Sequence, residues 1–213
     1  MAENLNRIEL AKRSTKEIYE RQADFWDEVR PSSLYEKPWL DRFLSKLPLD
    51  ARLLDLGCGS GIPIAGYFLN KGYALVGVDY ANRMIELARK RYPSADWPNA
   101  DWIAQDMNQL SLSGQFDGIY SWDGFFHLSI EEQREIIPKL SKLVKVQGAI
   151  MLTVGTSEGE VTGTVGGETV YHASLAPNEY EELFRQSGFE AVTFVAEDAD
   201  CMGRSVLLAS DKQ

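Results

Sequence analysis

Apolar residues occur along the chain in two alternating patterns. Short continuous apolar runs have the length of buried strands, and longer stretches with an apolar residue every three or four positions have the spacing of amphipathic helices. The short runs predict strands at 52–56, 74–79, 100–106, 116–122, 148–154, 191–197 and 205–210. The longer stretches predict helices at 62–72, 81–92, 129–144 and 176–188. Such alternation is typical of parallel βαβ units with right-handed connections, and the two final strands suit an antiparallel pair at one edge.

The first 48 residues show helical spacing only. One helix is predicted over 4–28, where the stretch RPSS follows it, and a second over 34–47. We therefore expect an N-terminal helical segment over 1–48, followed by an α/β domain over 49–213. The length of the chain suits one structural domain overall.

Local signals within the domain refine this picture. The predicted helix 129–144 begins at Ser129 with Glu132 three residues later, which is a capping box. Pro138 lies inside that helix and is expected to kink or interrupt it, because proline lacks the backbone N–H and clashes with the preceding turn. The glycine-rich stretch 155–169 is expected to be a flexible loop, and long loops in compact domains are often functional.

Composition excludes several classes of partner. The formal net charge is −10, which opposes binding to nucleic acid or anionic lipid. The N-terminal sequence is charged throughout, and no segment has the length of a signal-peptide core or a membrane span, so a cytoplasmic location without a membrane partner is expected. Cys58 and Cys201 are the two cysteines, and neither has metal-ligand spacing, so no metal is expected.

The most informative stretch is LLDLGCGSG at 53–61, where a predicted strand gives way to a glycine-rich turn and a helix. Glycine permits positive φ and close approach of the backbone to a ligand. In open α/β sheets ligands bind at the carboxyl ends of the strands, and the first βα turn is the usual place. Gly57, Gly59 and Gly61 have the spacing G-x-G-x-G, whereas a dinucleotide fingerprint has G-x-G-x-x-G.

Two acids indicate the chemistry of that ligand. A carboxylate at Asp55 would repel a pyrophosphate, so a ligand with a cationic part fits better than a nicotinamide dinucleotide. Asp79 ends the next predicted strand, 22 residues after Gly57, where an acid suits two ribose hydroxyls. S-adenosylmethionine combines an adenosine with an ammonium and a sulfonium, and it fits both acids. Alternative interpretations make the glycines turn formers only and Asp79 a helix cap.

Four segments together resemble the class I S-adenosylmethionine-dependent methyltransferases: LLDLGCGSG, VGVDYANRMIELAR, WIAQDM and FDGIYSWDGFFHL, in this order. The resemblance covers roughly residues 50–155. It implies a Rossmann-like, doubly wound seven-stranded sheet of order 3-2-1-4-5-7-6, with the last strand antiparallel, helices on both faces and an N-terminal helical lid. The segment KVQGA at 145–149 departs from the Pro-Gly-Gly turn of many members, so a changed turn is expected there.

The resemblance also implies cofactor contacts. Asp55 and the turn Gly57–Gly61 would bind the methionine end, together with the backbone of Ser121, and Asp79 would bind the ribose. The contacts implied for the adenosine are Tyr80 and Met84 lining its pocket, Asp106 accepting from the adenine amino group, and Met107 packing on the ring. Tyr19, in the N-terminal lid, is expected to cover the cofactor. Alternatively, Tyr80 and Met84 serve packing, Tyr19 makes an interhelical contact, and Asp106 is a solvated loop acid.

A small-molecule acceptor is the favoured substrate. Nucleic-acid methyltransferases of this fold often carry Asn-Pro-Pro-aromatic after the fourth strand, and this chain has SWDG at 121–124. We expect in-line transfer of a methyl group to an oxygen, nitrogen or sulfur nucleophile, leaving S-adenosylhomocysteine. The alternatives are an RNA or protein acceptor, a nicotinamide-dependent oxidoreductase, and a protein that binds the cofactor or a nucleoside without catalysis.

The acceptor side has few candidate groups. His127 follows the fourth predicted strand and is a candidate general base, because a histidine titrates near neutral pH. His172 is a candidate substrate contact from the far side of the pocket. Trp122 and Phe125 are candidates to stack on the acceptor, whereas Trp26 is expected in the core. Each histidine has a structural alternative.

Overall fold

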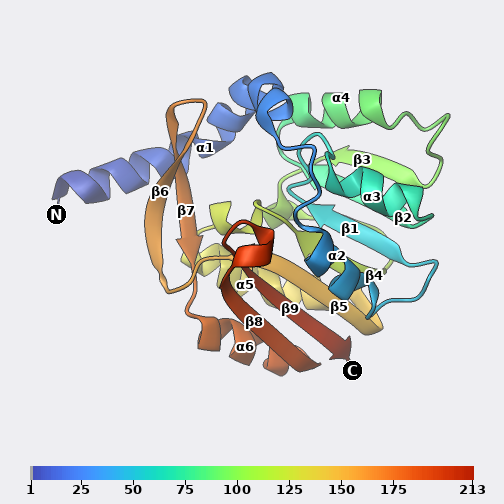
Figure 1. The fold of residues 1–213 in the computed structure, drawn as a ribbon. Helices are drawn as coiled ribbons and strands as arrows, with labels where there is room; N and C mark the ends of the chain where they lie inside the picture. Colours follow the sequence, from blue (N-terminus) through green and yellow to red (C-terminus); the bar gives the residue numbers. More distant parts are fainter. Residues whose placement is uncertain (1) are drawn as a thin grey trace.

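The computed structural model describes residues 2–213. Seven strands form one sheet in the order β3-β2-β1-β4-β5-β9-β8 (Figure 1). Their bounds are β1 Arg52–Leu56, β2 Ala74–Asp79, β3 Ala100–Ala104, β4 Phe116–Ser121, β5 Val144–Val154, β8 Phe189–Asp198 and β9 Arg204–Lys212. β1 to β5 pair in parallel, and β9 pairs antiparallel with both β5 and β8. The predicted fold class, strand order and antiparallel last strand are confirmed.

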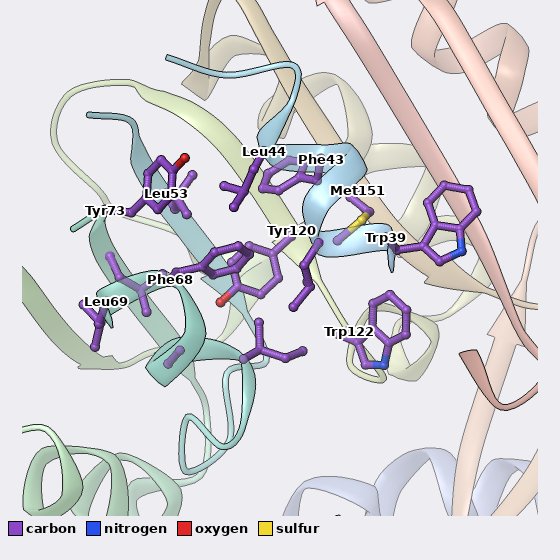
Figure 2. Packing of buried hydrophobic residues seen from close by; sticks show 14 of the residues in the cluster. Trp39, Phe43, Leu44, Leu53, Phe68, Leu69, Tyr73, Tyr120, Trp122 and Met151 are labelled. Atoms are coloured by element: carbon purple, nitrogen blue, oxygen red, sulfur yellow. The ribbon is translucent and has the colours of Figure 1, made fainter. Parts of the chain in front are cut away.

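Helices cover both faces of this sheet (Figure 1). On one face lie α2 Lys37–Leu44, α3 Ile64–Asn70 and α4 Asn82–Arg91, and on the other lie α5 Ile130–Leu143 and α6 Pro177–Gln186. Successive strand residues point to opposite faces, so Leu53 packs with the first set and Leu54 with the second. The core under α2 and α3 is aromatic: the ring of Phe68 lies 5.1 Å from Tyr120 and 6.4 Å from Phe43 (Figure 2).

The stretch predicted as a flexible loop is a β-hairpin, and that prediction was wrong. β6 Gly159–Val165 and β7 Glu168–Ser174 pair antiparallel along their whole length. Gly166 and Gly167 form the two-residue connection with φ of 55° and 81°. Two positive φ values in a two-residue loop match the twist of a hairpin, and a Gly-Gly pair between two strand-like runs is its sequence signal. The density of glycine obscured the alternating valines and threonines on either side.

Two smaller expectations concern α5 and the segment after it. α5 continues through Pro138 without interruption, so no break occurs there. Its capping box is present, with Ser129 and Glu132 each bonding the other's backbone N–H. β5 begins directly after the helix, and its pairing with β4 shifts register between Phe116 and Gly118. Gln147 has a φ of 64° near this irregularity, so residues 145–149, where a changed turn was expected, lie within β5 itself.

α1 Ala2–Val29 lies against the hairpin (Figure 1). Ile8 and Ala11 pack on Tyr171 and Ala173 of β7, and further along the helix Ile18 packs on Val165 and Val170. Arg21 and Gln22 of α1 both bond the carboxylate of Glu168. We call α1 together with β6 and β7 the α1–hairpin cover. In contrast, α2 is part of the main core, where Trp39, Leu40 and Phe43 are buried.

Candidate active site

A cavity opens at the carboxyl ends of β1, β2 and β4, beneath α1. This is the edge at which ligands bind in open α/β sheets. Most of the predicted site residues line it: Tyr19, Asp55, Gly57, Gly59, Gly61, Asp79, Tyr80, Met84, Met107, Trp122 and His127. Residues that the sequence did not suggest also line it, namely Trp26, Arg30 and Asp123.

The glycine turn needs glycine for two reasons. Gly57, Gly59 and Gly61 have φ of 74°, 53° and 83°, values that residues with a side chain rarely adopt. A Cβ on Gly61 would also lie 3.0 Å from the rings of Trp102 and Tyr92, and one on Gly57 would lie 3.2 Å from the backbone of Gly124. At Gly59 the space is open apart from Met84 at 3.8 Å. The two ends of the turn, at Gly57 and Gly61, are therefore closely packed against other residues, and its middle, at Gly59, has open space beside it.

Asp79 ties the turn to the next helix. Its carboxylate accepts hydrogen bonds from the backbone N–H of Gly59 and of Ala81, each at 2.9 Å. Burial raises the pKa of Asp79 to about 6, and the two backbone hydrogen bonds oppose that rise. The acid thus shapes the turn and also lines the cavity.

Asp55 is more deeply buried. Its carboxylate accepts a hydrogen bond from the Tyr120 hydroxyl at 2.7 Å. Burial, with the nearby charge of Asp79 as a smaller cause, raises the pKa of Asp55 to about 7. Within the described part of the chain no lysine or arginine forms an ion pair with either acid. Two buried carboxyls without a protein cation favour a ligand that brings positive charge.

Four predicted cofactor or acceptor contacts do not line this cavity: Asp106, Ser121, Phe125 and His172, the last of which lines a second cavity. Asp106 accepts from the backbone N–H of Asn108 at 3.0 Å and from Lys16, and it lines a neighbouring recess that shares Tyr80. The Ser121 hydroxyl is buried and donates to the carbonyl of Leu56 at 2.6 Å. Phe125 is fully buried in the core with Met107, because the short helix η2 Phe125–His127 turns its ring inward, so its placement gives no support to a stacking role.

A second cavity adjoins the first and shares Tyr19, Trp26 and Asp123 with it. Its other walls come from the ends of β5 and β9 and from the hairpin, and they include Phe126, Thr153, Thr164, His172 and Arg204. Arg204 donates to both carboxylate oxygens of Asp123, at 3.0 and 3.1 Å. Sequence reasoning missed this pair. Asp123 stands directly after a predicted strand end, which is a usable signal, whereas Arg204 comes from a distant strand.

The two histidines lie side by side, with ring centroids 5.0 Å apart. His127 Nδ1 lies 2.8 Å from the carbonyl oxygen of Tyr171, and its Nε2 lies 2.9 Å from the Tyr19 hydroxyl. Burial, with the charge of His172 as a smaller cause, lowers the pKa of His127 to about 4. Burial also lowers the pKa of His172, whose ring lies 4.6 Å from that of Phe126. Both imidazoles are therefore neutral at pH 7.

Comparisons with known proteins agree with this geometry. Residues 53–148 match a family model described as a methyltransferase domain. The chain is 25% identical over 86% of its length to an uncharacterized methyltransferase of Oceanobacillus iheyensis, of which it covers 79%. The chain belongs to the class I S-adenosylmethionine-dependent methyltransferases.

Solved methyltransferases share the fold of this methyltransferase over nearly its whole length. An amino pentose methyltransferase of Micromonospora echinaspora, solved with S-adenosylmethionine bound, is 18% identical, with a TM-score of 0.68 over 90% of this chain and 96% of its own. A Burkholderia thailandensis 1,6-didemethyltoxoflavin-N1-methyltransferase, solved with S-adenosylhomocysteine, is 18% identical, with a TM-score of 0.70 over 93% of this chain and 88% of its own. The cofactor of this methyltransferase is S-adenosylmethionine.

Other sequence relatives carry different acceptors in their names. A tRNA (carboxymethyluridine(34)-5-O)-methyltransferase of Xenopus tropicalis is 26% identical over 61% of this chain and 20% of its own length. Human EEF1A lysine methyltransferase 2 is 27% identical over 54% of this chain and 51% of its own length. Among residues 2–213, no helix of this methyltransferase is both long and apolar enough to cross a bilayer.

Proposed function

We propose that this methyltransferase transfers the methyl group of S-adenosylmethionine to a small-molecule acceptor held in the second cavity. One observation carries the proposal: the α1–hairpin cover walls the second cavity on the side away from the sheet, and the cavity joins the first through Tyr19, Trp26 and Asp123. An acceptor enclosed there would lie next to the first cavity. Enclosure of this kind holds two reactants in line and excludes water, which is most of what a sulfonium methyl transfer requires.

Charge favours a small molecule over RNA. The charged residues of the second cavity are Asp123, Glu197 and Arg204, and Arg204 is already paired with Asp123. A channel for a polyanion needs several unpaired cations along its length. The net charge of −10 acts in the same direction. The two solved methyltransferases described above are named for a sugar and a heterocyclic acceptor, which supports a small-molecule acceptor at the level of the fold.

The residues of the first cavity suit the cofactor. In the proposal Asp55 lies near its ammonium and sulfonium, Asp79 bonds the ribose, and the glycine turn allows close approach of the methionine end. Tyr80, Met84 and Met107 would line the adenosine, and Asp106 would reach the adenine amino group from the neighbouring recess. When bound, S-adenosylmethionine supplies an activated methyl group, so the protein contributes orientation and charge.

Two measurements test the proposal in order. Calorimetry should detect binding of S-adenosylmethionine and S-adenosylhomocysteine and no binding of NAD. The protein should then produce S-adenosylhomocysteine from S-adenosylmethionine with at least one member of a metabolite library. Turnover with tRNA or protein fractions alone would contradict the small-molecule acceptor. Binding without turnover on any of these fractions would favour a non-catalytic binding protein.

A further inference from the structure

The hydrogen bonds around His127 have a fixed polarity. A backbone carbonyl oxygen carries no proton, so in the contact between Tyr171 and His127 the Nδ1–H group must donate. In a neutral imidazole the other nitrogen is then an acceptor. The Tyr19 hydroxyl therefore donates its single proton to His127 Nε2, at 2.9 Å. Tyr19 thus donates to His127, and His127 donates to the carbonyl oxygen of Tyr171.

The α1–hairpin cover holds this chain in place. The backbone N–H of Tyr171 donates to the Thr15 hydroxyl at 2.8 Å, and that hydroxyl donates to the carbonyl of Ala11 at 2.7 Å. Thr15 and Tyr19 are four residues apart on α1 and share a face of the helix. The same face of α1 thus bonds the backbone N–H of Tyr171, the residue whose carbonyl orients His127, and supplies the phenol that His127 orients.

The Tyr19 ring is held by aromatic neighbours. Its centroid lies 5.0 Å from His127, 6.2 Å from Trp26 and 6.5 Å from Tyr80, each with an edge-to-face orientation. Tyr19 lines both cavities, so it stands where the cofactor side meets the proposed acceptor side. Burial raises the pKa of its phenol, with the charges of Asp123 and Asp79 as further causes, so the hydroxyl stays protonated.

A phenol oxygen has one proton to donate and lone pairs with which it accepts. We propose that the Tyr19 oxygen accepts a hydrogen bond from the reacting atom of the acceptor, so that the site selects acceptors with an N–H or O–H group and disfavours carboxylates and thiolates. Tyr19 is the catalytic contact, and His127 is a positioning residue that acts through it. This inference rests on the proposed function, and it deepens it by naming the acceptor class.

The proton balance follows from this arrangement. The lone pair of the acceptor nitrogen or oxygen forms the bond to the methyl carbon while the carbon–sulfur bond breaks and its electron pair stays on sulfur. The proton that points at Tyr19 remains on the methylated product and is then lost to water. Neither Tyr19 nor His127 changes its protonation state.

Nitrogen-15 NMR of the histidine side chains tests the polarity without any acceptor. The chain has two histidines, so a His172→Gln variant assigns the signals of His127. We expect a neutral ring protonated at Nδ1 between pH 6 and 8, and in Tyr19→Phe we expect the same tautomer with a shifted Nε2 signal. Protonation at Nε2, or an imidazolium in this pH range, would overturn the inference while leaving the proposed function untouched.

Compounds that carry different reacting groups on the same ring test whether the site selects acceptors with an N–H or O–H group. Amine, alcohol, thiol and carboxylate compounds built on phenyl and cyclohexyl rings are incubated with S-adenosylmethionine, and S-adenosylhomocysteine is measured. Turnover is expected with the amine or alcohol members. Tyr19→Phe is expected to lower kcat/KM for them about 10- to 100-fold, with the Kd for S-adenosylhomocysteine changed by less than about threefold.

Tyr67→Phe is the matched control, because its hydroxyl bonds Asp41 and neither residue lines either cavity. It should leave kcat/KM and the Kd unchanged. Efficient turnover of a thiol or carboxylate, undiminished in Tyr19→Phe, would overturn the inference and leave methyl transfer intact. Binding of S-adenosylmethionine without turnover of this panel or of the metabolite library would contradict the proposed function, and this inference with it.

Discussion

Asp55→Asn should stabilise the free methyltransferase and at the same time weaken its binding of S-adenosylmethionine. Asp55 is 4% exposed, and burial raises the pKa of its carboxyl from 3.8 to about 7. Each tenfold change in an ionisation constant corresponds to about 1.4 kcal/mol, so the charged form costs the folded state about 4 kcal/mol above pH 7. Asparagine removes that charge and keeps an oxygen that accepts from the Tyr120 hydroxyl, which bonds Asp55 at 2.7 Å.

The sign of the pH dependence follows from the raised pKa. A carboxyl with a higher pKa in the folded state than in the unfolded state stabilises less as pH rises from about 4 through 7. Between pH 5 and pH 8 the parent should therefore lose about 2–3 kcal/mol of its free energy of unfolding through Asp55. The gain from Asp55→Asn should be about 1–2 kcal/mol at pH 5 and about 4 kcal/mol at pH 8.

Urea unfolding of parent and variant at pH 5 and pH 8, without cofactor, measures this difference. Asp50→Asn, at an exposed acid before β1, is the matched control and should change the free energy of unfolding by less than about 0.5 kcal/mol at both pH values. Calorimetry at pH 8 should show weaker binding of S-adenosylmethionine to Asp55→Asn, since the variant lacks the anion that the cationic ligand would face. A loss of stability in Asp55→Asn that is equal at both pH values would refute the reasoning.

Three further results are expected. Asp79→Ala should weaken binding of S-adenosylmethionine and S-adenosylhomocysteine by about the same 1.5–3 kcal/mol in calorimetry, because both carry the ribose; unchanged binding would leave Asp79 as a turn-shaping residue only. Gly61→Ala should lower the free energy of unfolding by about 2 kcal/mol or more in urea, because its φ is 83° and a Cβ would lie 3.0 Å from two aromatic rings; a smaller loss would mean that the turn adapts. The pH profile of kcat/KM should show no limb from His127 between pH 6 and 8, because its pKa is lowered to about 4, and a limb that vanishes in His127→Ala would contradict this.

The fold was accessible from the sequence because each element of the sheet carries its own local signal. Apolar runs, the glycine turn and the acids at strand ends are short-range patterns, and they predict β1 to β5 and the helices between them. The hairpin was missed because β6 is rich in glycine and threonine, and the apolar partners of both strands, such as Ile8 and Ile18, lie in α1. Burial that depends on a segment more than a hundred residues away leaves no local pattern.

The same contrast between short-range and long-range signals decides which site residues could be predicted. Residues at or just beyond the carboxyl end of a strand, such as Asp55, Asp79 and His127, were found because parallel strands bring these ends to one edge. The position of Trp26 beside both cavities was missed. Helical spacing predicts that an aromatic residue is buried, but it does not predict which part of the molecule the residue contacts. The contact between Tyr19 and His127 joins residues 108 positions apart, and only the packing of α1 across the hairpin creates it.

The interlocking of α1 with β6 and β7 has a consequence for engineering. Thr15 bonds the Tyr171 peptide, and Arg21 and Gln22 bond Glu168, so each segment supplies half of every contact that holds the other. A chimaera that takes the hairpin from another methyltransferase and keeps this α1 would lose those partners and the orientation of His127 together. We therefore expect acceptor specificity to be transferred only when residues 2–29 and 159–174 are exchanged together.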